Sequence, residues 1–116
     1  MANKVTIYHN PRCSKSRETL QLLNDAKANV EIVEYLKSPL SATKLKGLIK
    51  LLGIDAEELV RKGEPIYKEK FKGKSLSEAK WIEAMVDNPK LIERPIVSTG
   101  TKAVLGRPPQ NVNKLI

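Results

Sequence analysis

Several residue types are scarce in this sequence, and each scarcity excludes a class of protein. The 116 residues include one cysteine and one histidine, so no internal disulfide can form and too few soft ligands are present for a zinc site. Only five residues are aromatic (three Tyr, one Phe, one Trp) and they are scattered, whereas nucleic-acid binding favours aromatic side chains along a basic stripe. The longest apolar stretches, such as LIKLLGI at 48–54, are too short to cross a bilayer. We therefore expect no metal, nucleic acid or membrane as a partner.

The composition that remains is typical of one small globular domain. A hydrophobic fraction of 41% and a length of 116 residues predict a single domain, residues 1–116, with one real core. The first residues do not resemble a secretory signal, and a lone thiol is typical of a reducing compartment. We expect a monomer in the cytoplasm.

The positive charge is carried by two residue types that are used differently. The net charge is +8, and the 16 lysines are spread along the whole chain, as expected for a solvated surface. Three of the five arginines lie beside a proline: Arg12 in PRC, Arg94 in ERPIV and Arg107 in GRPPQ. A planar guanidinium is the side chain of choice for holding an oxyanion or a carboxylate, and proline restricts the backbone next to it. This pattern favours a small anionic ligand.

The periodicity of apolar residues predicts an α/β fold. A strand at 4–9, a helix that begins near Ser14 and a strand at 30–36 form a βαβ unit, whose strands should be parallel. Residues 95–106 predict a hairpin that turns around Thr99 and Gly100, and a final short helix follows it. Together these elements predict a mixed four-stranded sheet.

Between the two halves of this sheet, residues of about 41–88 predict a helical insertion. Ser41 can cap a first helix, which Gly53 ends. A second helix is predicted over 55–63, with Arg61 near its C-terminal end. That position leaves open whether Arg61 serves a site or the negative end of the helix dipole.

A third helix of the insertion has a capping-box pattern at its start. Ser75 is followed three residues later by Glu78, and Pro89 ends the apolar period.

The stretch HNPRCSKSRETL, residues 9–20, places Cys13 just before the first helical turn. Backbone amides there are unpaired and carry the positive end of the helix dipole, so the pKa of a thiol should fall. Arg12, Lys15 and Arg17 add positive charge nearby. The flanking residues are polar, which favours a nucleophile over a buried structural cysteine, although the structural alternative stays open.

Two other polar residues belong to this stretch. Ser16 completes a C-x-x-S pattern, and its hydroxyl can donate a hydrogen bond to the thiolate. His9, at the end of the first strand, can orient the loop or be an ordinary hydrogen-bonded loop residue. Because a serine stands where a dithiol would need its second cysteine, any disulfide must form with an outside thiol, such as glutathione or glutaredoxin.

The order βαβ followed by ββα, around a cysteine at a helix start, is the plan of the thioredoxin-like fold. In that plan a proline begins the third strand beside the cysteine, often after a cis peptide bond. Pro95, in RPIV, occupies this place.

Four short motifs occur in order along the chain: IYHNPRCSKSR at 7–17, LVRKGEP at 59–65, ERPIV at 93–97 and LGRPP at 105–109. Over essentially its whole length the sequence thereby resembles the glutaredoxin-linked arsenate reductases, the ArsC family. Four ordered motifs are far more specific than any one of them. The resemblance implies a single thioredoxin-like, ArsC-type domain.

The resemblance also implies a mechanism. Cys13 would attack arsenate as the nucleophile, while Arg61, Arg94 and Arg107 would bind and stabilise the oxyanion. Glutathione would act as co-substrate, glutaredoxin would resolve the mixed disulfide, and no cofactor would stay bound. His9 corresponds to the family histidine that tunes the cysteine, and Ser16 to its hydrogen-bonding serine.

Three alternatives stay open at this point. The protein could be a glutaredoxin-like enzyme acting on glutathione mixed disulfides, with the arginines binding glutathione carboxylates. It could be a binding module similar to the Spx-type regulators, although these usually carry C-x-x-C where Ser16 stands here. The chain also ends at Ile116, soon after GRPPQ, which resembles the short chromosomal paralogues and leaves another oxyanion possible as the physiological substrate.

Overall fold

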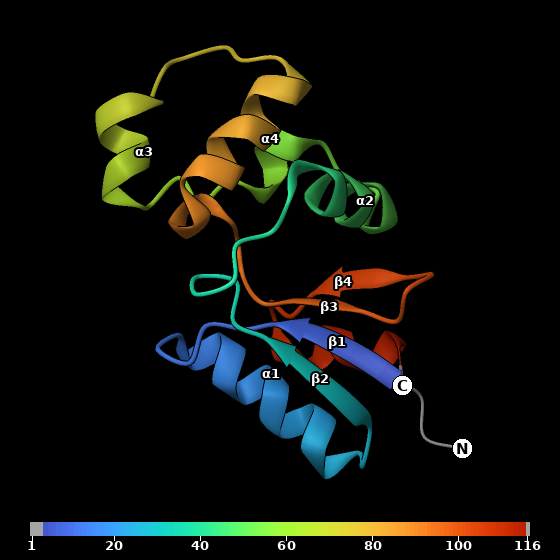
Figure 1. Ribbon diagram of the computed structural model, residues 1–116. Helices are drawn as coiled ribbons and strands as arrows, with labels where there is room; N and C mark the ends of the chain where they lie inside the picture. The colour runs from blue at the N-terminus through green and yellow to red at the C-terminus, as the bar shows by residue number, and fades with distance from the viewer. Residues whose placement is uncertain (1–3, 116) are drawn as a thin grey trace. The chain divides into compact units, whose positions relative to one another are not determined.

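The computed structural model describes residues 4–115 and divides into two compact units. The first unit combines the N-terminal part of the chain, as far as Ser38, with the C-terminal part from Arg94 onward. The second unit is Pro39–Glu93. Figure 1 shows the strands gathered in the first unit and the helices α2, α3 and α4 in the second.

The first unit is a four-stranded mixed sheet with helical elements on it. Its elements are β1 (Lys4–Tyr8), α1 (Ser14–Asp25), β2 (Asn29–Val33), β3 (Ile96–Ser98), β4 (Ala103–Leu105) and the 3-10 helix η3 (Pro109–Lys114). The strand order is β2-β1-β3-β4; β1 pairs with β2 in parallel, and the other two pairings are antiparallel. The predicted fold class, α/β with a mixed four-stranded sheet, is confirmed.

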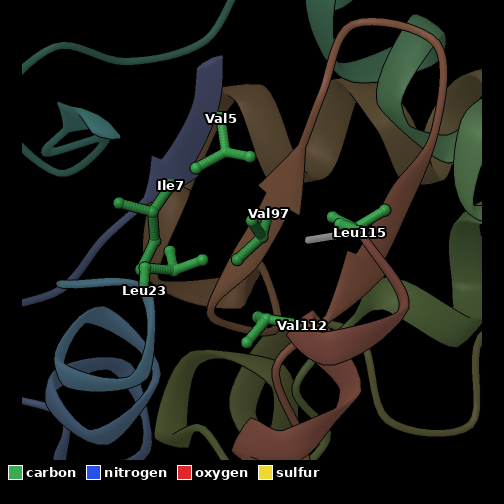
Figure 2. Packing of buried hydrophobic residues seen from close by; sticks show 6 residues of the cluster. All are labelled: Val5, Ile7, Leu23, Val97, Val112 and Leu115. Carbon is green, nitrogen blue, oxygen red and sulfur yellow. The ribbon is translucent and has the colours of Figure 1, made fainter. Parts of the chain in front are cut away.

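One face of this sheet forms the core of the first unit. Val5 and Ile7 alternate along β1 with the period of a strand, and Val97 lies opposite Ile7 on β3. In Figure 2 these three side chains gather with Leu23 of α1 and with two side chains from the C-terminal end of the chain, Val112 and Leu115. Because α1 and η3 also contact each other, they cover the same face of the sheet. Burial of each large side chain contributes roughly 1.5–3 kcal/mol.

The strand β2 ends earlier than the sequence predicts. It stops at Val33, and a turn follows in which the amide of Lys37 donates to the carbonyl of Glu34 at 2.9 Å. Tyr35 lies in this turn and is nonetheless 1% exposed. The apolar pattern of VEIVEYL therefore combines a half-buried strand with one buried turn residue.

The second unit is helical, as the sequence predicts for the insertion. Its elements are α2 (Ala42–Leu52), the 3-10 helix η1 (Ala56–Leu59), α3 (Pro65–Lys70), α4 (Glu78–Asp87) and the 3-10 helix η2 (Pro89–Leu91). The start and end of α2 are as predicted: the Ser41 hydroxyl accepts from the amide of Lys44 at 3.1 Å, and Gly53 takes the left-handed conformation with φ of +70°.

The predicted capping box of the third helix is wrong. Ser77, and not Ser75, is the N-cap, with its hydroxyl accepting from the amide of Lys80 at 3.3 Å. The Glu78 carboxylate accepts instead from the amide of Ala56, at 3.1 and 2.9 Å. A contact distant in sequence has thus replaced the local one.

The predicted helix over 55–63 is also wrong. Only Ala56–Leu59 is helical, as a single 3-10 segment, and Val60 forms an isolated antiparallel bridge with Ile92. Arg61 therefore follows an extended residue and does not end a helix. Its amide donates to the carbonyl of Leu91 at 2.7 Å. The short helix α3, which Pro65 begins, was not predicted.

No helix in the part of the chain that the structure describes is long and apolar enough to cross a membrane.

Candidate active site

A tightly folded loop brings Cys13 to the start of α1. The side-chain oxygen of Asn10 accepts from the amide of Arg12 at 3.0 Å, and its carbonyl accepts from the amide of Cys13 at 3.0 Å. Cys13 is the N-cap residue of α1 and has extended backbone dihedrals, while its carbonyl accepts from the amide of Arg17 at 3.0 Å. The sulfur is thereby held where the helix presents its unpaired amides.

Beneath this loop lies a buried polar pair. The Nδ1 atom of His9 and the hydroxyl of Ser16 are 2.6 Å apart, and the same hydroxyl accepts from the amide of Asn10 at 3.0 Å. The sequence predicts that the Ser16 hydroxyl bonds the thiolate. In the structure this hydroxyl is bonded to His9 and Asn10, and it is the amide of Ser16 that donates to the Cys13 sulfur.

Burial lowers the pKa of His9, and the nearby charge of Arg17 lowers it too, while Glu34 acts in the opposite direction. His9 is therefore neutral near pH 7, and one of its ring nitrogens can accept a hydrogen bond. This supports the interpretation of His9 as the residue that holds the loop through Ser16.

The C-terminal part of the first unit supplies two arginines to the cysteine. The Nε atom of Arg107 donates to the carbonyl of Arg94 at 2.6 Å, and its Nη2 atom lies 3.6 Å from the Cys13 sulfur. The Arg94 side chain also donates a hydrogen bond to that sulfur. The peptide bond between Arg94 and Pro95 is cis, as predicted; the bond between Arg107 and Pro108 is cis as well, which was not predicted.

A close contact sets the backbone just before Arg107. The amide of Gly106 donates to the carbonyl of Pro95 at 2.9 Å, and the hydroxyl of Thr19 lies 3.3 Å from the carbonyl of Gly106. A Cβ atom at Gly106 would lie 2.6 Å from Oγ1 of Thr19 and 2.8 Å from Cγ of Pro95. Only glycine fits between α1 and the cis proline at this point.

Burial alone would raise the pKa of the Cys13 thiol, because it disfavours the charged form. Hydrogen bonds from the amides of Ser16 and Lys15, together with the hydrogen bond and charge of Arg94, outweigh that effect and lower the pKa below its ordinary value. The predicted activation of the thiol by the helix start thus has a structural cause, to which Arg94 adds.

Arg61, the third arginine of the sequence prediction, belongs to the second unit. There its Nη1 atom lies 3.4 Å from a carboxylate oxygen of Glu64, and its Nε atom lies 3.5 Å from one of Glu93. These two partners hold a guanidinium that is about one quarter exposed. Its role in binding an oxyanion stays a prediction.

The structure thus brings together five residues of the predicted site, and it adds others. Cys13, His9, Ser16, Arg94 and Arg107 all lie in the first unit within one network of contacts. Sequence reasoning missed three residues that support this network: Asn10, Thr19 and Gly106. Asn10 lies within the motif IYHNPRCSKSR and Gly106 within LGRPP, and these positions were the available signals.

A cysteine at a helix start, a cis proline at the start of β3 and a mixed sheet ordered β2-β1-β3-β4 define a protein of the thioredoxin-like fold. A model of the ArsC family matches residues 8–115, and the chain belongs to that family.

Relatives agree with this assignment over the full length. The chain is 52% identical to an uncharacterized protein of Escherichia coli K12, YfgD, over 100% of this chain and 99% of that one. It is 42% identical to an arsenate reductase of Haemophilus influenzae, over 97% of this chain and 98% of that one. A solved structure of an arsenate reductase from Vibrio cholerae superimposes with a TM-score of 0.95 at 43% identity and covers 100% of both chains.

Proposed function

We propose that this protein reduces arsenate to arsenite, with Cys13 as the nucleophile and with glutathione and glutaredoxin supplying the external thiols. The observation that carries the proposal is the position of Arg107, whose Nη2 atom contacts the sulfur while its Nε atom is fixed on the Arg94 carbonyl. A guanidinium fixed beside a thiolate is suited to bind the tetrahedral oxyanion that the thiolate attacks. The names of the relatives from Haemophilus influenzae and Vibrio cholerae support arsenate as that oxyanion.

The first step is the formation of a sulfur–arsenic bond. The Cys13 thiolate attacks arsenic(V), and one arsenate oxygen takes up protons and leaves as water. Negative charge on the remaining oxygens is stabilised by Arg94 and Arg107, which are fixed before the reaction begins. Arg61, which carries a third guanidinium, is proposed to bind the same oxyanion.

The reduction itself needs a second thiol. Arsenic(V) becomes arsenic(III) by taking up two electrons, and two thiols are joined in a disulfide. The chain has one cysteine, so the second thiol must come from outside. Glutathione fills this role, leaving a mixed disulfide on Cys13 as arsenite departs, and glutaredoxin then returns Cys13 to the thiol by exchange.

This chemistry places further requirements on the protein. Electrons come from glutathione, so no bound cofactor is needed. The thiol must stay reduced between turnovers, which is typical of the cytoplasm. All residues proposed for the site come from one chain, so a monomer is sufficient.

The test is steady-state oxidation of NADPH in a mixture of the protein, glutathione, glutaredoxin and glutathione reductase, with and without arsenate. We expect an arsenate-dependent rate that the Cys13→Ser variant abolishes, with arsenite formed in proportion to NADPH consumed. A rate that is independent of arsenate, measured with a glutathione mixed disulfide as substrate, would identify a glutaredoxin-like enzyme. Absence of any arsenate-dependent rate in the complete mixture would refute the proposal.

A further inference from the structure

Two acidic residues lie in the sequence motifs of the site but have no role in the chemistry described so far. Glu64 belongs to LVRKGEP and Glu93 to ERPIV. Both carboxylates face the guanidinium of Arg61, at 3.4 Å from its Nη1 atom and 3.5 Å from its Nε atom respectively. Two negative charges beside an arginine that is proposed to bind an anion need an explanation, because charge alone would weaken the binding of that anion.

The ion pairs of Arg61 are more buried than those of the lysines. The lysine ion pairs in residues 4–115 join side chains that are 39–80% exposed. Arg61, Glu64 and Glu93 are 25%, 19% and 26% exposed. Exposed pairs of flexible side chains contribute little, whereas water and salt screen partly buried charges less. The two carboxylates therefore hold Arg61 more firmly than a surface pair would.

The backbone places both partners beside Arg61. The amide of Arg61 donates to the carbonyl of Leu91, and the amide of Glu93 donates to the carbonyl of Leu59, each at 2.7 Å. Glu64 comes one turn after Arg61, whose carbonyl accepts from its amide at 3.2 Å. Although Glu64 is the N-cap residue of α3, its side chain makes no cap hydrogen bond. Its carboxylate instead accepts from Nη1 of Arg61.

The two carboxylates leave one nitrogen of the Arg61 guanidinium for a ligand. A guanidinium presents two paired edges to its partners, Nε with Nη2 and Nη1 with Nη2. Glu93 lies at Nε and Glu64 at Nη1, and Nη2 makes no hydrogen bond within residues 4–115. An oxyanion can therefore be bound through Nη2 while both carboxylates stay in place.

We propose that Glu64 and Glu93 are positioning residues, which orient Arg61 so that its Nη2 atom donates to the oxyanion. They act only through Arg61. A donor that is already fixed loses little conformational freedom when the anion binds, and this advantage outweighs the repulsion from the two carboxylates. The inference rests on the proposed function, in which Arg61 binds the oxyanion, but the orientation of Arg61 is a property of the resting protein.

The first measurement follows the Arg61 side chain without substrate. The ¹⁵N–¹H heteronuclear NOE of an arginine Nε atom reports motion on the picosecond-to-nanosecond timescale, and single Arg→Lys variants identify the signals of Arg61 and of the exposed Arg12. We expect Arg61 Nε to be more rigid than Arg12 Nε, and to become more mobile in Glu64→Asp and in Glu93→Asp. If Arg61 is as mobile as Arg12 in the unchanged protein, the positioning is refuted, whether or not the protein reduces arsenate.

The kinetics of two Glu64 variants separate orientation from charge. Glu64→Asp keeps the charge but withdraws it by one methylene, and α3 should be retained because Asp is itself a favoured N-cap. Glu64→Gln keeps the reach and an acceptor oxygen but removes the charge. We expect the KM for arsenate to rise roughly three- to tenfold in Glu64→Asp with little change in kcat, and to change less in Glu64→Gln. A lower KM in Glu64→Asp would show that the carboxylate competes with the anion; that result, or an unchanged KM, would overturn the proposal.

Two controls complete the test. Glu57→Asp alters a carboxylate of the same unit that pairs with Lys62 at 3.2 Å, and it should leave the KM unchanged. In an Arg61→Ala background, Glu64→Asp should have no further effect on the KM, because the residue through which it acts is gone. An equal effect with and without Arg61 would contradict the proposal.

A titration with arsenate alone distinguishes a failure of this inference from a failure of the proposed function. The Arg61 Nε signal should shift on binding, and Glu64→Asp should need more arsenate for the same shift. If arsenate shifts the signal but no turnover occurs, only the proposed reduction is refuted. If arsenate leaves the Arg61 signal unchanged, the role of Glu64 and Glu93 in binding the oxyanion is refuted.

Discussion

Replacement of Gly106 by alanine should displace the backbone that carries Arg107. The new methyl group would contact none of the residues proposed to bind the substrate. The new methyl group would lie 2.6 Å from Oγ1 of Thr19, 2.9 Å from Cγ2 of Thr19 and 2.8 Å from Cγ of Pro95. All three distances are far below van der Waals contact. Two of the three atoms belong to Thr19 of α1 and the third to Pro95, just before β3, and both residues are buried. Either α1 or the segment that carries Arg107 must move.

The expected loss of stability follows from overpacking. Extra methyl groups in a well-packed interior destabilise by about 1–3 kcal/mol, and we expect Gly106→Ala to fall in this range. A matched control is Gly47→Ala, in the middle of α2, where a Cβ atom would meet nothing within 4 Å. Since alanine is favoured over glycine inside a helix, the control should be more stable than the parent by about 0.5–1 kcal/mol.

Urea unfolding followed by far-UV circular dichroism measures both changes, and arsenate-dependent turnover measures the effect on the site. Gly106→Ala should lose activity, because the displaced backbone moves the Arg107 guanidinium away from the sulfur that it contacts at 3.6 Å. Adding Thr19→Ala removes two of the three close atoms and should restore part of the stability. If Gly106→Ala were as stable and as active as Gly47→Ala, the close packing behind Arg107 would be refuted.

Three further predictions follow from single contacts. Arg107→Ala should lower arsenate-dependent turnover by roughly 10²-fold. Arg107→Lys should be similarly slow, because an ammonium cannot bond the Arg94 carbonyl and the Cys13 sulfur as the guanidinium does. Steady-state kinetics of the two variants measure both effects. Ser77→Ala should destabilise by about 1 kcal/mol through loss of the α4 cap, whereas Ser75→Ala should leave the urea midpoint unchanged, and equal midpoints for the two variants would contradict the cap assignment. Burial in the native state disfavours protonated His9, so the unfolded chain binds a proton more readily than the folded one. The free energy of unfolding should therefore fall as the pH drops below about 6.5. A His9→Gln variant with the same slope of unfolding free energy against pH would exclude this cause.

Most of the first unit could be predicted from the sequence, because its signals are local. The alternation of Val5 and Ile7 indicates a strand, and the change of period after Cys13 indicates a helix start. The cis proline at Pro95 was predictable from its place in the plan of the fold. These residues adopt the structures that their immediate neighbours favour.

The second unit was harder to predict because contacts distant in sequence decide it. Glu78 looks like the end of a capping box, but its carboxylate bonds the amide of Ala56. Likewise, the apolar spacing at 55–63 indicates a helix, whereas pairing of Val60 with Ile92 draws the chain into an extended form. No local pattern carries that information.

In the candidate site, too, local signals were predictable and contacts distant in sequence were not. Cys13 was evident from its polar surroundings and its helix-start position. The convergence of Arg94 and Arg107 on its sulfur depends on the pairing of strands and on the fit of Gly106 against Thr19, and neither can be read from spacing along the chain.

The central claim is that the fold lowers the pKa of the Cys13 thiol and so favours the thiolate that attacks an oxyanion. The most direct test is the pH dependence of Cys13 alkylation by iodoacetamide in the unchanged protein, since no other thiol can react. Amides of Ser16 and Lys15 and the charge of Arg94 lower the pKa of this thiol, so the rate should reach its half-maximum clearly below the ordinary thiol value of about 8.5. A half-maximum at or above that value would contradict the account.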